Sequence, residues 1–106
     1  MTRNRTKPDP ILDVDRIALS NELYELSERF AMEAVLWTPQ AAHDECVRVA
    51  RTLAQIARGV ISGAADFRKA EAFRDAARML SEYVVGARRL FDGLSHLPNV
   101  ERKDDQ

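Results

Sequence analysis

The stretch FRDAARMLSEYVVGARRLFDGL, residues 73 to 94, repeats apolar side chains every seven residues and decides the predicted fold. Two heptad positions carry the repeat, one with Phe73, Leu80, Ala87 and Leu94, the other with Ala77, Val84 and Phe91. A repeat of this period places the side chains along one side of a helix. Two flanking positions are also apolar or small, so the arc covers roughly 160° of the helix. An arc this wide predicts a helix with two neighbours rather than one.

Two further helices precede this one, and each has an apolar seam of its own. The first lies within residues 11–37, with the seam Leu19, Leu23, Leu26, Phe30 and Ala34. The second runs from Pro39 to about Ser62, with the seam Cys46, Ala50, Leu53, Ala57 and Val60. We expect Thr38 to cap the second helix and Asp66 to cap the third, because short polar side chains accept free N–H groups there. The third helix should end near Asp92, with Gly93 in a left-handed conformation.

These elements predict an all-α protein, an up-down-up three-helix bundle over residues 11–97. Residues 1–10 and 98–106 show no periodicity and are expected to be disordered arms. The rival arrangement is a larger helical bundle, in which two chains share one core. Apolar residues beyond the three seams, such as Val49, Ile56 and Val85, favour that rival and predict a homodimer.

Composition excludes several classes of protein. The chain has 106 residues, 45% hydrophobic and 31% charged, which is typical of one globular domain. Its net charge of −1 gives no overall attraction to nucleic acid or to anionic lipid. Cys46 is the only cysteine, so no internal disulfide forms, and a reducing, cytoplasmic location is expected. No apolar run approaches the ~18 residues of a membrane span, so no membrane partner is expected.

The sequence contains no motif of a catalytic, metal or cofactor site, which predicts a protein that is not an enzyme and needs no cofactor. His43 and Cys46 share a helix face, but two ligands do not make a zinc site. Cys46 lies on the second seam and reads as a buried thiol. Glu25, Arg29 and Glu33 stand four residues apart and read as a row of charges facing solvent.

Function is therefore expected to reside in a surface, and two interpretations of that surface remain beside a third, an enzyme whose site forms between subunits. The first is a non-enzymatic adaptor, inhibitor or regulator that contacts a protein partner through exposed aromatic and arginine side chains. Its candidate interaction surface consists of Trp37, Tyr83, Arg88, Arg89 and Phe91. The alternative is a nucleic-acid-binding protein whose arginines contact phosphates. The candidates for that role are Arg48, Arg51, Arg58, Arg74 and Arg78.

Overall fold

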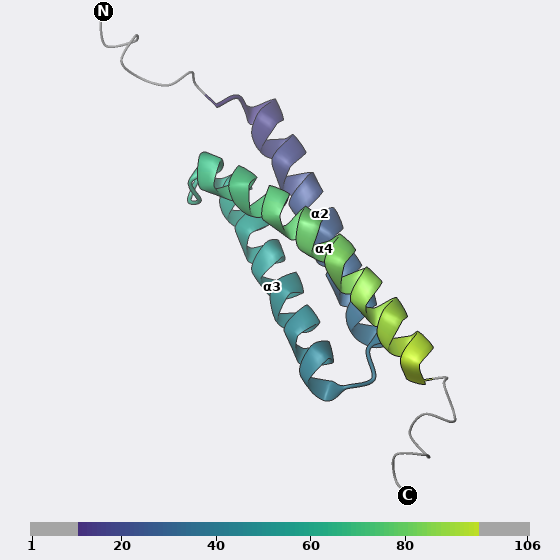
Figure 1. Cartoon of the computed structure of the whole chain (residues 1–106). Coiled ribbons are helices and arrows are strands. Elements are labelled where there is room, and N and C mark those ends of the chain that lie inside the picture. The colour runs from purple at the N-terminus through teal and green to yellow at the C-terminus, as the bar shows by residue number, and fades with distance from the viewer. Residues whose placement is uncertain (1–10, 96–106) are drawn as a thin grey trace, which may run out of the picture.

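The computed structural model describes residues 11–95, which form three helices joined by two short turns (Figure 1). Helix α2 spans Asp13–Leu36, α3 spans Gln40–Ser62 and α4 spans Phe67–Ser95. Residues 11–95 contain no strand, so the predicted all-α class is confirmed. The two predicted arms, residues 1–10 and 98–106, lie outside the described residues. None of these three helices combines the length and apolar composition that crossing a bilayer requires.

Helices α2 and α3 form an antiparallel hairpin whose register is marked by three hydrogen bonds. The Ser20 hydroxyl donates to the Ala57 carbonyl at 3.0 Å, and the Ser27 hydroxyl donates to the Ala50 carbonyl at 2.8 Å. One heptad further along, Nδ1 of His43 lies 2.8 Å from the Ala34 carbonyl, at hydrogen-bonding distance. The three contacts recur every seven residues on both helices, so they fix one alignment of α2 against α3.

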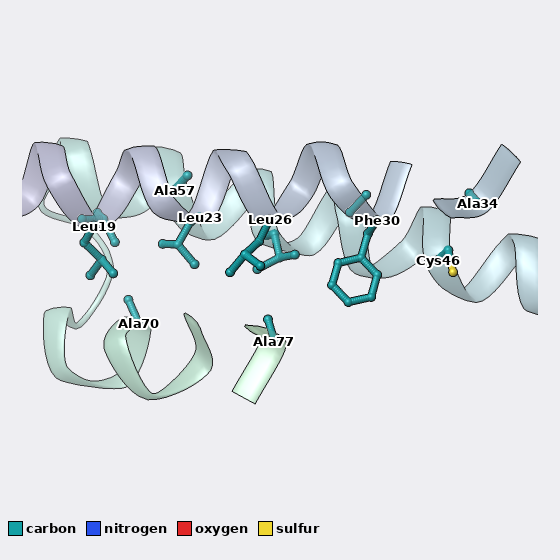
Figure 2. Close-up of a cluster of buried hydrophobic side chains, with 12 residues drawn as sticks. Leu19, Leu23, Leu26, Phe30, Ala34, Cys46, Ala57, Ala70 and Ala77 are labelled. Atoms are coloured by element: carbon teal, nitrogen blue, oxygen red, sulfur yellow. The ribbon is translucent and has the colours of Figure 1, made fainter. Parts of the chain in front are cut away.

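The predicted seams of α2 and α3 meet between the helices and form most of the core. All ten seam residues named from the sequence are buried. Leu23, Leu53 and Val60 have no exposed surface at all. Figure 2 shows the α2 side chains of this cluster, with Ala70 and Ala77 of α4 approaching from the third helix. The core predicted for the first two helices is therefore confirmed.

The helix ends agree with the sequence in part. The Asp66 carboxylate accepts the backbone N–H of Lys69 at 3.0 Å, which confirms the predicted cap of α4. Pro39, not Thr38, precedes the first residue of α3 and makes no side-chain cap. Gly93 lies inside α4, which continues to Ser95, so its predicted left-handed turn is wrong. The left-handed glycine of residues 11–95 is Gly63, with φ of 83°, at the end of α3.

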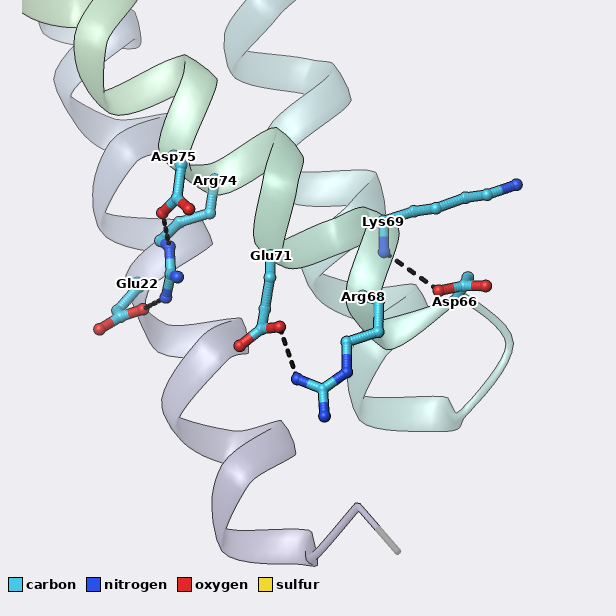
Figure 3. A network of polar contacts seen from close by, with 7 residues as sticks. All are labelled: Glu22, Asp66, Arg68, Lys69, Glu71, Arg74 and Asp75. Carbon is cyan, nitrogen blue, oxygen red and sulfur yellow. Dashed lines mark hydrogen bonds and ion pairs between the residues drawn. The ribbon is translucent and has the colours of Figure 1, made fainter. Parts of the chain in front are cut away.

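Helix α4 packs on α2 far more than on α3. It begins beside the end of α3, crosses over α2 and runs in the same direction as α2 (Figure 1). Its buried side chains are small, Ala70, Ala77 and Ser81, so the two backbones approach closely. Arg74 of α4 forms ion pairs with Glu22 of α2 and with Asp75 of its own helix (Figure 3). The third helix is thus attached mainly to one neighbour, whereas the sequence predicts two.

Candidate interaction surface

The larger apolar side chains of α4 face solvent and form its most extended apolar surface. We call this surface the α4 outer face and define it by Phe73, Ala76, Leu80, Tyr83, Ala87, Leu90 and Leu94. Its large side chains range from 36% exposed at Phe73 to 73% at Tyr83. Phe73, Leu80, Ala87 and Leu94 are the first heptad position of the opening stretch, which the sequence places in the core. That placement is wrong, because α4 turns its small residues inward.

The α4 outer face has the spacing that helices use to pack on one another. Its residues follow each other at alternating intervals of three and four, as at the contacting positions of a coiled coil. It is about 32 Å long at 1.5 Å per residue, and no charged residue lies on it. The row beside it, Ala72, Met79, Gly86 and Gly93, is also uncharged. The exposed apolar residues of α2, by contrast, are separated on the helix surface by polar residues such as Asn21 and Glu28.

An apolar groove adjoins the first turns of this face. It lies between α3 and α4, and Ile56, Ala65, Ala70 and Phe73 supply its apolar walls. Its volume is about 230 Å³, and its open side leads to solvent. The groove exists because α4 leaves α3 soon after the turn and moves across α2. Phe73 belongs to both the groove and the α4 outer face, so the two form one continuous apolar surface.

The five residues proposed from the sequence as an interaction surface do not form one cluster. Trp37 and Phe91 pack together, with ring centroids 5.9 Å apart, and join the end of α2 to the end of α4. Tyr83 and Arg89 are both exposed, but they point about 120° apart around α4. Arg88 faces α2 and forms an ion pair with Glu33 of that helix. Of the five, Tyr83 belongs to the α4 outer face.

Arg88 is the main polar link between the last turns of α4 and α2. Its guanidinium donates hydrogen bonds to the Glu33 carboxylate and pairs with Asp92 at 3.3 Å. The hydrogen bond to Glu33 raises the pKa of Arg88 above its usual value, so the guanidinium stays charged. Glu33 is buried at 7% exposure, so its predicted place in a solvent-facing row is wrong. Glu25 and Arg29, the other two members of that row, are exposed as predicted.

Three of the five arginines proposed for phosphate contacts form ion pairs with carboxylates. Arg48 pairs with Glu45, and Arg74 and Arg78 both reach Glu22. Burial lowers the pKa of Arg74, but hydrogen bonds and the charges of Glu22 and Asp75 raise it by more. Arg51 and Arg58 are exposed on α3, and within residues 11–95 neither has an ion-pair partner. Three of the five arginines therefore balance acidic neighbours, and Arg51 and Arg58 are the two without an ion pair in this part of the chain.

Cys46 and His43 both lie where α3 packs against α2. Burial first, and then the negative charges of Glu33 and Glu45, raise the pKa of the Cys46 thiol. A raised pKa lowers the thiolate fraction, so this cysteine is a poor nucleophile at neutral pH. His43 contacts the Ala34 carbonyl near the end of α2, which also accepts the backbone N–H of Trp37 at 3.3 Å. Within residues 11–95 no three His, Cys, Asp or Glu side chains converge in a way that could hold a metal ion.

Comparison with known proteins identifies no family for this chain. No protein-family model matches it, and no curated protein or solved structure is significantly similar to it.

Proposed function

We propose that this protein is a non-enzymatic adaptor, inhibitor or regulator that works through protein–protein contacts made by its α4 outer face. The observation that carries the proposal is the unbroken, uncharged row of apolar side chains from Phe73 to Leu94, whose large members are all exposed. Exposed apolar patches of this extent mark contact surfaces, because leaving them in water costs free energy. The three-four spacing favours a helix as the contacting element.

The same proposal accounts for the uneven packing of the three helices. An up-down-up bundle closes when its third helix contacts both others, and here the contact of α4 with α3 is small. We propose that a bound protein completes the bundle by covering the α4 outer face and the adjoining groove. The lone cysteine supports a reducing, cytoplasmic setting for this contact.

The experiment compares partner capture by the wild type with capture by two double variants. Leu80→Gln/Leu90→Gln removes apolar character from the α4 outer face, while Met32→Gln/Val35→Gln does the same on α2. All four side chains are substantially exposed, so both variants should keep their helical circular dichroism. Each protein is immobilised and exposed to an extract of the native host.

We expect the α2 variant to retain the proteins that the wild type captures and the α4 variant to lose them. Capture of the same proteins by a folded α4 variant would show that the α4 outer face is not the working surface.

A further inference from the structure

We infer that the α4 outer face binds the same face of a second copy of this chain, with the two α4 helices antiparallel. This inference rests on the proposed function, because it names the occupant of the proposed surface. A two-fold interface uses one patch twice, so the patch must be complementary to itself. The sequence of the α4 outer face meets that condition in one antiparallel alignment.

In this alignment the two-fold axis passes between the two α4 helices at the level of residue 85, and each residue of the face lies opposite one whose number adds to about 170. Tyr83 then packs against Ala87 of the partner subunit, and Ala76 packs against the partner's Leu94. Leu80 meets the partner's Leu90. The largest side chain of the face thus meets a small one, and each layer holds a similar volume, as close packing requires.

The row beside the face fits the same alignment. Met79 faces the partner's Gly93, so the bulky thioether meets a position without a side chain. Gly86 lies opposite the partner's Gly86, where the missing Cβ atoms let the two helices approach closely. No side chain surrounds either glycine within 4 Å of the position that a Cβ would occupy, so both are open to a partner.

A parallel pair would lack this complementarity. Each residue would then meet its own copy, so Tyr83 would stack on the partner's Tyr83 and Ala76 on the partner's Ala76. Such layers alternate between crowded and empty, and both overpacking and cavities are destabilising. Parallel helices would also align their dipoles unfavourably.

Charge and area both favour a second copy as the occupant. The α4 outer face carries no charge, so two copies can meet without bringing like charges into contact. Five of its side chains are large and at least 36% exposed. With the neighbouring Met79, they offer on the order of 600 Å² per chain, since a fully buried aromatic covers about 150–250 Å². That is close to the ~800 Å² per partner of a standard stable interface.

The first test is the mass of the purified full-length chain in sedimentation equilibrium. We expect twice the chain mass of 12.0 kDa, and an increase of at least about 100-fold in the dissociation constant for Leu80→Gln/Leu90→Gln. The α2 variant Met32→Gln/Val35→Gln should dimerise like the wild type. A monomer at every concentration, or a dimer unaffected by the α4 variant, would overturn the inference.

The second test measures the orientation by spin labels in a Cys46→Ala background. Single labels at Asp75→Cys and Glu82→Cys lie on the exposed, charged side of α4, where they border the proposed contact without belonging to the α4 outer face. In the antiparallel alignment the two labels at position 75 are offset by about 30 Å along the helices, and those at position 82 by about 9 Å. A parallel pair has no offset at either position, so equal distances at the two positions would overturn the inference.

These outcomes separate the inference from the proposed function. A monomeric protein that still loses its captured partners in the α4 variant disproves the second copy and leaves the proposed function intact. A dimer of the expected orientation whose α4 variant captures the same partners as the wild type disproves the proposed function and supports the inference.

Discussion

The alignment of α2 against α3 should depend measurably on two serine hydroxyls. Ser20 and Ser27 each donate to a carbonyl of α3, and Ser20 is 1% exposed. Replacing a serine with alanine removes one oxygen atom and one interhelical hydrogen bond, and it leaves the carbonyl with its own helical partner. A hydrogen bond of this kind contributes about 0.5–1.5 kcal/mol net. We therefore expect Ser20→Ala and Ser27→Ala each to lower the free energy of unfolding by about 1 kcal/mol.

The double variant should lose about 2 kcal/mol, because the two sites lie about 10 Å apart on α2 and share no partner. Urea unfolding, followed by circular dichroism at one fixed protein concentration, gives these values if the slope stays constant. Ser62→Ala is the matched control, since its exposed hydroxyl makes local contacts, donating to the Gly59 carbonyl and accepting the Ala64 N–H, and joins no second helix. If Ser20→Ala and Ser27→Ala are as neutral as this control, the hydroxyls do not hold the hairpin and the reasoning fails.

Three further predictions concern the core, the buried carboxylate and the thiol. Leu53→Ala, at a fully buried position, should cost about 2–5 kcal/mol in urea unfolding. Leu80 is 41% exposed, so Leu80→Ala should lower the free energy of unfolding clearly less than Leu53→Ala, at protein concentrations too low for association. An equal loss in the two variants would contradict the assignment of Leu80 to the surface. Glu33→Gln should lower the melting temperature, because it weakens the ion pair with Arg88 of α4. Glu25→Gln, on the exposed side of α2, should leave the melting temperature unchanged. Equal melting temperatures of the two variants would contradict a stabilising role for the Glu33–Arg88 pair. Folding raises the pKa of Cys46 above its unfolded value of about 8.5. The wild type should therefore lose stability relative to Cys46→Ala as pH rises from 8 to 10, because the unfolded chain releases the thiol proton more readily. Melting temperatures of the two proteins that change in parallel with pH would contradict this prediction.

The seams of α2 and α3 could be predicted from the sequence because their apolar residues recur at intervals of three and four without a polar interruption. On α2 the other apolar residues are interrupted by polar ones such as Asn21 and Glu28, and on α3 the side opposite Leu53 is polar, so a helical wheel leaves one orientation for each seam. A helical wheel does not reveal that Ser20 and Glu33 are buried and Ser27 partly buried, because a polar side chain is assigned to water unless its partner is known. Their partners lie on other helices, 37, 23 and 55 residues away, and sequence spacing within one helix gives no information about them.

The placement of α4 could not be predicted from hydrophobicity, because too much of its surface is apolar. Its heptad repeat has two apolar edges, one with Ala77 and Val84 and the other with Leu80 and Tyr83, and a wheel centres the core between them. Side-chain size distinguishes the edges. Small residues let α4 lie close on α2, and the cross-helix ion pair of Arg74 fixes that side toward α2.

The side of α4 that faces α2 carries small residues and its outer side carries large ones, and this division bears on function. If folding of one chain were the only requirement on α4, the greatest stabilisation would come from burying Leu80, Leu90 and Phe73, since free energy scales with the apolar area removed from water. The structure instead buries alanine and serine on α2 and leaves those larger side chains exposed. Such a helix is attached to its own chain by close backbone approach and ion pairs, and it keeps its larger apolar area for another surface. An apolar face arranged in this way favours a binding element over a helix that serves only the core of its own chain.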